Sequence, residues 1–378
     1  MANSSSTIVI GREALLPAMT TVQRAVERRN TIPILANVMI SAEAGQLTLT
    51  ATDLDMEITT RRTCQLAGPA VTVTLPAGNL HDIVRKLPEG CEVQLSGDEQ
   101  TWTIAAARSK FRLPCLPASD FPSMSRADMP ASFRLPAETL ARMIDTVRFA
   151  ISTEETRYYL NGIHWHRDAE SDLLVAVTTD GHRLARVAVA TPEGAAELPP
   201  VIVPRKTTEV VTKILPAKGD VAIEVSQTRI SFALDDGTTL ISKLIDGTYP
   251  DYRRVVPQGN PNRFLVDRAA LAAAVDRVIT ISAGRDSSVK FGFGDGELLL
   301  TTNNPEAGSG EDGMAVVMQA GAPVEIGFNG RYCLDLLAAC TSENVIFELG
   351  DAGSPARLVP AVDDANSPYF VLMPMRVS

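Results

Sequence analysis

The segment Pro136–Ser152, PAETLARMIDTVRFAIS, decides the fold, because its pattern of apolar residues occurs three times along the chain. Leu140, Met143, Ile144 and Val147 have the i, i+3, i+4, i+7 spacing of an amphipathic helix. The same spacing occurs earlier, from residue 15, and later, from residue 271. The sequence therefore predicts three similar amphipathic helices.

The three copies are evenly spaced and are succeeded by similar sequences. Leu15, Leu140 and Leu271 are separated by 125 and 131 residues. Runs of alternating residues typical of strands come after each helix, and a second helix then ends at a proline in the first two copies. Those prolines, Pro88 and Pro216, are 128 residues apart. Agreement at several landmarks within a narrow range of spacing predicts a chain of three repeated units.

Each repeat is predicted to contain two helices and about eight strands, an α+β fold in which helices cover one face of an antiparallel sheet. Pro17 predicts a kink or a late start in the first helix. The predicted domains are residues 1–126, 127–257 and 258–378. The predicted helices are Arg12–Arg29, Asn79–Leu87, one within Pro136–Ser152, Lys206–Leu215, Asp267–Ile279 and Tyr332–Ala339.

The composition is that of a soluble globular protein, with 45% apolar and 21% charged residues among 378. The amino terminus has no secretory pattern, and no apolar stretch approaches the length of a membrane span. We therefore expect a cytoplasmic protein without a membrane partner. The cysteines are odd in number, scattered and without a CxxC motif, so they are predicted to be reduced thiols. They are Cys64, Cys91, Cys115, Cys333 and Cys340.

The net charge of −10 argues against a nucleic-acid partner, but the charge is unevenly distributed. Windows placed on the six predicted helices hold 15 Lys and Arg against 10 Asp and Glu, whereas the rest of the chain holds 20 and 35. These windows are residues 12–29, 76–89, 136–148, 204–218, 265–277 and 327–340. Basic helices on an acidic body suit a protein that tracks a phosphate backbone. The alternative is that helices simply favour Arg and Lys. The most basic points are Arg24, Arg28, Arg29 and the pair Arg205-Lys206.

No motif for catalysis is evident, since GxxxxGK[ST], GxGxxG after a strand, HExxH and GxSxG are all absent. His164 and His166 would share one strand face, but no third metal ligand accompanies them. Asp180 and His182 permit an acid–base interpretation, and a cytosolic hydrolase using this region is the alternative function. A turn with Gly181 at its tight position explains the same residues. We expect no enzyme, no metal and no cofactor.

Three tandem repeats of antiparallel sheet would leave unpaired sheet edges in the first and third repeats. Pairing the first repeat of one subunit with the third repeat of another would remove those edges by closing a ring. The sequence thus suggests a ring-forming dimer.

At the level of individual motifs the chain resembles the bacterial replicative sliding clamp, the beta subunit of DNA polymerase III. The match runs along essentially the whole chain. Its most specific blocks are RYYLNG (Arg157–Gly162), TDGHRL (Thr179–Leu184), VIVPRK (Val201–Lys206), YPDYRRV (Tyr249–Val255), NNPE (Asn303–Glu306) and MPMR (Met373–Arg376).

The resemblance implies a homodimeric ring of six domains, in which twelve helices line a hole filled by double-stranded DNA. The clamp acts as a processivity factor in DNA replication, and its binding is independent of sequence because it rests on phosphates rather than base edges. By position, Arg29, Tyr158 and Tyr159 are the DNA-binding candidates. Arg205 and Lys206 join them on charge and placement. A scaffold protein with no nucleic-acid partner remains a further alternative, which requires the charge bias to be accidental.

The resemblance also implies a partner-peptide pocket that holds short motifs from the replicative DNA polymerase, the clamp loader, and repair and translesion polymerases. The implied dimer interface consists of Phe111 and Leu113 on one subunit and Thr280 and Ile281 on the other. The implied pocket residues are Leu160, Thr179, Gly181, His182, Arg183, Leu184, Pro250, Arg254, Val255, Asn329, Tyr332, Val371, Met373, Pro374, Met375 and Arg376.

Overall fold

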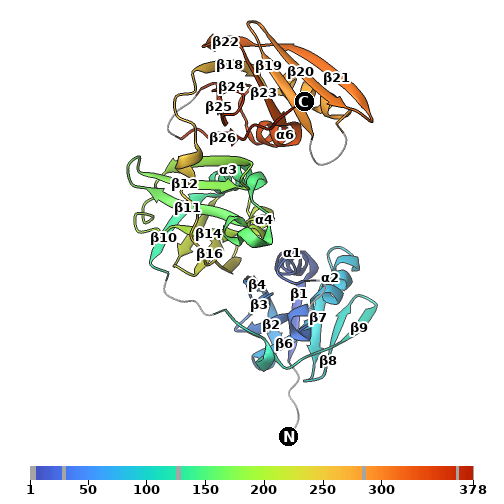
Figure 1. The fold of residues 1–378 in the computed structure, drawn as a ribbon. Helices are drawn as coiled ribbons and strands as arrows, with labels where there is room; N and C mark the ends of the chain where they lie inside the picture. Colours follow the sequence, from blue (N-terminus) through green and yellow to red (C-terminus); the bar gives the residue numbers. More distant parts are fainter. Residues whose placement is uncertain (1–5, 28–30, 125–128, 283–286, 363–365, 378) are drawn as a thin grey trace. The chain divides into compact units, whose positions relative to one another are not determined.

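The computed structural model describes residues 6–27, 31–124, 129–282, 287–362 and 366–377 (Figure 1). The chain divides into two compact units, Met1–Ala137 with Glu209–Leu244, and Glu138–Thr208 with Ile245–Ser378. Each unit contains two antiparallel sheets. The second predicted repeat therefore contributes strands to both units.

The smaller sheet of the first unit has the strand order β5-β1-β7-β8-β9. Alternate residues of β8 are buried, among them Trp102 and Ile104, so one face of this sheet belongs to the core. β9 is the last strand of the sheet. The strands are β1 (Thr7–Gly11), β5 (Gln65–Ala67), β7 (Glu92–Gly97), β8 (Thr101–Ala106) and β9 (Ser109–Pro114).

The larger sheet of the first unit has the order β10-β15-β16-β17-β4-β3-β2-β6. Ile58 of β4 lies opposite Leu240 of β17, so strands from two repeats form one continuous sheet. The strands are β2 (Asn37–Glu43), β3 (Gln46–Thr52), β4 (Met56–Thr63), β6 (Val71–Pro76), β10 (Ala131–Pro136), β15 (Asp220–Val225), β16 (Arg229–Leu234) and β17 (Thr239–Lys243).

Two helices of the first unit, α1 (Arg12–Val22) and α2 (Ala77–Lys86), pack against each other, and α1 also covers β3 and β4. α1 begins at Arg12, so Pro17 does not delay its start. The prediction that this helix continues to Arg29 is wrong. Beyond Val22 the amide of Ala25 bonds the carbonyl three residues back, at 3.0 Å, instead of four, and the helix ends in a turn.

The nine-stranded sheet of the second unit has the order β14-β11-β12-β13-β26-β25-β24-β18-β22. Leu184 of β13 lies opposite Val371 of β26, which joins the second repeat to the carboxy-terminal strand. The strands are β11 (Gly162–Asp168), β12 (Leu173–Thr179), β13 (Arg183–Ala190), β14 (Val201–Pro204), β18 (Asn262–Asp267), β22 (Val317–Ala320), β24 (Asn344–Leu349), β25 (Ala356–Pro360) and β26 (Tyr369–Leu372).

The second unit also contains a four-stranded sheet of order β21-β20-β19-β23, in which β21 is the last strand. Helices α5 (Arg268–Ile279) and α6 (Gly330–Ala339) pack on each other beside it. Their starts are fixed by capping, since Asp267 accepts from the amide of Ala270 and Asn329 from that of Tyr332. The strands are β19 (Ser288–Phe293), β20 (Glu297–Asn304), β21 (Gly308–Ala315) and β23 (Val324–Asn329).

The remaining helices are α3 (Ala137–Val147) and α4 (Arg205–Ile214). In α3 the predicted residues Leu140, Met143, Ile144 and Val147 are all buried. The six predicted helices are thus all present, and the α+β prediction is confirmed. None of the described helices is both long enough and apolar enough to span a membrane. The described residues also form five short 3-10 helices: η1 (Pro33–Ala36), η2 (Ala118–Asp120), η3 (Arg148–Ala150), η4 (Glu155–Leu160) and η5 (Tyr252–Val255).

Candidate functional site

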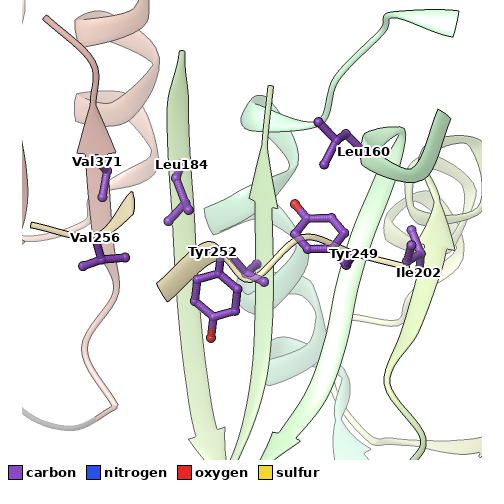
Figure 2. Close-up of a cluster of buried hydrophobic side chains, with 8 residues drawn as sticks. Leu160, Leu184, Ile202, Tyr249, Tyr252, Val256 and Val371 are labelled. Carbon is purple, nitrogen blue, oxygen red and sulfur yellow. The ribbon is translucent and has the colours of Figure 1, made fainter. Parts of the chain in front are cut away.

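A cluster of eight buried side chains in the second unit forms a surface that we call the floor (Figure 2). It gathers residues from η4, β12, β13, β14, β26 and the segment 245–256, which we call the strap. Three of the predicted pocket residues, Leu160, Leu184 and Val371, belong to it. The complete floor is Leu160, Val177, Leu184, Ile202, Tyr249, Tyr252, Val256 and Val371.

Beside the floor, the turn between β12 and β13 is held by the carboxylate of Asp180. Its Oδ1 accepts from the amides of His182 at 2.9 Å and Arg183 at 3.0 Å. Gly181 has φ +90°, and a Cβ there would lie 2.6 Å from Nη1 of Arg157. Glycine is therefore favoured at this position for its backbone conformation, and a larger residue would also have to displace the end of the Arg157 side chain.

Arg183 is the best-anchored polar side chain near the floor. Its Nε donates to Asp180 at 3.0 Å, one Nη donates to the carbonyl of Phe149 at 2.9 Å, and the other pairs with Asp335. The guanidinium also lies over the ring of Tyr332, 4.4 Å from its centroid. Since all three of its guanidinium nitrogens are hydrogen-bonded, Arg183 is a fixed part of the floor's edge and not a mobile charge. We call this edge the rim, and its members are His182, Arg183, Pro250, Arg254, Val255 and Met373.

The carboxy-terminal segment is tied to two other parts of the second unit. The amide of Met373 donates to the carbonyl of His182, and that of Met375 to the carbonyl of Gly327, both at 2.9 Å. A Cβ at Gly327 would clash with the carbonyl oxygen of Met375. These contacts hold the methionines next to the turn.

Two exposed apolar residues border the floor. Val255 is 48% exposed and Met373 is 37% exposed, whereas Leu184 and Val371 beneath them are almost fully buried. Exposed apolar side chains beside a buried apolar cluster suit an extended ligand that inserts one or two apolar side chains.

The other predicted pocket residues lie at the same site in different roles. Thr179 bonds the carbonyl of Arg183 at 2.8 Å, and Asn329 caps α6. The ring of His182 lies 6.0 Å from that of Tyr332. Arg254 pairs with Asp251 at 3.1 Å. The remaining members are Pro250 and Arg376, which are exposed, and Pro374 and Met375, which are half-buried.

Five of the eight floor residues were not predicted from the sequence. Val177, Ile202, Tyr249, Tyr252 and Val256 were not predicted at the site. The YPDYRRV block was the available signal, because both tyrosines lie within it.

The DNA-binding candidates are partly brought together. Tyr158 is 53% exposed, and its ring lies 5.8 Å from that of Tyr159, which packs against the floor. The amide of Arg205, at the start of α4, donates to the carbonyl of Asn161 at 3.1 Å, which places it next to the end of η4. Lys206 is the next residue and is exposed. Arg29 lies outside the described residues.

The four dimer candidates lie on or beside the terminal strands of two sheets. Phe111, on β9, is 40% exposed, whereas Leu113 on the same strand is buried. Thr280 is exposed and Ile281 half-buried after α5. Ile281 lies next to β21, since its side chain would be 3.4 Å from a Cβ at Gly310.

The hydrolase alternative receives no support from the geometry. The carboxylate of Asp180 is used by the turn and by Arg183, and the ring of His182 packs near Tyr332. No group of three or more His, Cys, Asp or Glu side chains suited to a metal is present in the described part of the chain. The five thiols are unpaired by disulfides.

Three family models together match nearly the whole chain. DNA polymerase III beta subunit, N-terminal domain, matches residues 6–125, the central domain of the same subunit matches residues 134–251, and its C-terminal domain matches residues 253–376.

The beta sliding clamp of Caulobacter vibrioides is 45% identical over 375 residues, covering 98% of this chain and all of the relative. That of Escherichia coli K12 is 36% identical over 373 residues, covering 97% and 99%. A crystal structure of the sliding clamp from Bartonella birtlesii bound to griselimycin is 45% identical. It superposes with a TM-score of 0.94 and covers 99% of this chain and all of the other.

Proposed function

Because the chain belongs to the DNA polymerase III beta subunit family, the beta sliding clamps, we propose that the floor, its rim and the strap form its partner-binding site. The function is that of the family: the chain is a non-catalytic processivity factor that encircles duplex DNA and tethers DNA polymerase. The residues that bind partners, close the ring and contact DNA are proposed from their contacts, exposure and charge.

The observation that carries the partner-site proposal is the pairing of a buried floor with the exposed Val255 and Met373. Griselimycin binds a relative of 45% identity, which supports a peptide-like ligand site in this chain. We propose that short extended peptides bind here by inserting apolar side chains above Leu184 and Val371. The replicative polymerase, the clamp loader, and repair and translesion polymerases would share this site and therefore compete for it.

The ring is proposed to close between β9 of one subunit and β21 of the other. Each is the last strand of its sheet and so offers unpaired backbone groups. The exposed Phe111 would pack against Thr280 and Ile281 of the partner. The charges on the two strips are opposite: Lys110 and Arg112 on β9 with Arg108 in the turn before it, and Glu311 and Asp312 on β21 with Glu306 in the turn before it.

A charge exchange tests this closure. Lys110→Glu with Arg112→Glu should dissociate the dimer through like-charge repulsion, and Glu306→Lys with Glu311→Lys should do the same. Mixing the two variants should restore a dimer, because both interfaces of the mixed ring again join opposite charges. Sedimentation velocity measures each state. Variants that remain dimeric alone, or a mixture that remains monomeric, would place the interface elsewhere.

For DNA, we propose that Tyr158, Tyr159, Arg205 and Lys206 contact the duplex through its backbone. The support is the exposure of Tyr158 and Lys206 and the closeness of η4 to the start of α4. Arg29 remains part of this proposal by its position in the sequence. We place the protein in the cytoplasm, where bacterial DNA is replicated.

A further inference from the structure

Two histidines of β11 lie behind the strap and contact both of its tyrosines. The rings of His164 and Tyr249 are stacked, with centroids 4.6 Å apart and planes within 6°. Nε2 of His166 is 3.1 Å from the hydroxyl of Tyr252, at hydrogen-bonding distance. The histidines are two residues apart on one strand and so share a face, and their rings are 5.0 Å apart.

The two tyrosines connect these histidines to the partner-binding site. Tyr249 and Tyr252 belong to the floor, together with Leu184 and Val371. Figure 2 shows Tyr249, Tyr252 and Val256 one after another along the strap, with Leu184 and Val371 on the neighbouring strands. The rim residues Pro250, Arg254 and Val255 lie on the same short segment. Any shift of the tyrosines therefore moves the rim.

The histidines are also accessible from outside the floor. A pocket of about 480 Å³ opens beside the strap, and its lining includes both imidazoles and both phenol rings. Asp168 and Arg253, which pair at 3.3 Å, lie at its wall. Water and protons can therefore reach the imidazoles without displacing a ligand from the floor.

We propose that His164 and His166 are positioning residues for the partner-binding site: they hold the strap through Tyr249 and Tyr252, and protonation of His164 releases it. This inference rests on the proposed function, because it assigns the strap to the peptide site. It adds a control point that lies outside the surface a peptide touches.

The surroundings of His164 favour its neutral form. Burial and, to a smaller extent, the charge of His166 lower the pKa of His164 to about 4, against the opposing effect of the hydrogen bond with the carbonyl of Val201. Tyr249 stays protonated because burial raises its pKa.

The pKa of His166 is lowered mainly by burial, against the effect of a backbone hydrogen bond at Arg167. The charges of Arg253 and Arg186 lower it further, and that of Asp168 raises it. Burial also raises the pKa of Tyr252. Arg167, Glu170 and Asp251 complete the charged groups of the pocket wall.

The direction of the pH effect is set by these shifts. Because the docked strap holds the pKa of His164 below its ordinary 6.5, the docked state prefers the neutral imidazole. The neutral imidazole stabilises the docked strap fully above pH 6.5. This stabilisation is lost as the pH falls from 6.5 to about 4. Between pH 7 and pH 5 this linkage weakens strap docking by up to about twentyfold.

Griselimycin binding, measured by calorimetry between pH 7.5 and 5.0, tests the inference. The measurements use a His182→Gln background, which removes the imidazole of the rim. Affinity should fall as the pH is lowered. His164→Ala should weaken binding about tenfold at pH 7.5, because it removes the ring that supports Tyr249. His164→Phe keeps a stacked ring without a titrating group, so it should restore the affinity and reduce the pH dependence to the part that His166 contributes.

Tyr252→Phe provides a milder second variant that keeps the aromatic ring. Losing the bond to His166 should weaken binding about threefold.

Equal affinity and an equal pH profile in His164→Ala, His164→Phe and the background would overturn the inference. Leu184→Ala separates this failure from that of the site itself. If that change in the floor has no effect on griselimycin binding, the proposed site is wrong, whereas a large effect with inert His164 variants refutes only the positioning role.

Discussion

The proposed partner-binding site and the proposed DNA-contacting residues are built in opposite ways. The site has a floor of buried side chains and a rim in which Arg183 is fixed by three hydrogen-bonding partners. The DNA candidates are surface groups: Tyr158 is 53% exposed, and Arg205 and Lys206 are exposed at the first turn of α4. Tyr159 belongs to both regions, because it packs against the floor.

The difference reflects the task of each region. A site that selects short peptides gains affinity from a preorganised surface, because little conformational entropy is lost on binding. A surface along which DNA slides needs contacts that are weak and interchangeable, since any strong single contact would stop the movement. Single changes should therefore have large effects at the site and small effects at the DNA surface.

The largest effect is expected from removing Met373–Ser378. This deletion removes the bonds of Met373 to His182 and of Met375 to Gly327, together with the exposed apolar edge of the floor. Griselimycin affinity should fall by more than about a hundredfold, which corresponds to several lost apolar and backbone contacts. Calorimetry measures the affinity, and sedimentation should show an unchanged dimer.

The matched control for this deletion removes Ser378 alone and should bind griselimycin normally. If the full deletion binds griselimycin as tightly as the intact chain, the carboxy terminus lies outside the site. The contrast between a preorganised peptide site and a weakly binding DNA surface would then be unsupported.

A much smaller effect is expected from Lys206→Ala on DNA. Loss of one phosphate contact per subunit should reduce the slope of log K against log salt by about 0.9 for each contact. The affinity at low salt should fall only a few-fold, and griselimycin binding should not change. Fluorescence anisotropy with a labelled duplex measures both quantities. Lys218→Ala, at an exposed lysine beyond α4, is the control. A hundredfold loss from Lys206→Ala alone would contradict the account of weak, interchangeable contacts.

The sequence predicted the repeated architecture because each repeat begins with a helix whose apolar spacing is visible locally. Helix starts were predictable where a capping residue marks them, as Asp267 does for α5. The end of α1 was not, because Val26 continues the apolar spacing after the hydrogen bonding has changed. Repeats and helix starts depend on residues close together in the sequence, so they can be predicted from the sequence.

Pairings between distant strands could not be read in the same way. Strand β4 pairs with β17, and β13 pairs with β26, although about 180 residues or more separate the partners in each case. Alternation of apolar residues identifies a strand but does not specify its neighbour. For this reason the shared sheets, and the division of the second repeat between two units, emerged only from the structure.

The candidate site was predictable only in part, for a similar reason. Leu184 and Val371 lie within recognisable strands and motifs. Tyr249 and Tyr252 lie on the strap, whose one regular element is the single 3-10 turn η5, so no apolar periodicity marks them. His164 and His166 suggested a metal as a possibility that the sequence disfavoured. Their contacts with the two tyrosines depend on tertiary structure alone.

The central claim, that this chain acts as a closed ring on DNA, is tested most directly by retention on a circular template. The protein is loaded onto nicked plasmid with a clamp loader from the same species and ATP, washed in high salt, and the plasmid is then cut once. We expect retention on the circle and loss after linearisation, since topology and not charge holds the ring. Binding that salt removes, or that linearisation leaves unchanged, would contradict an encircling clamp.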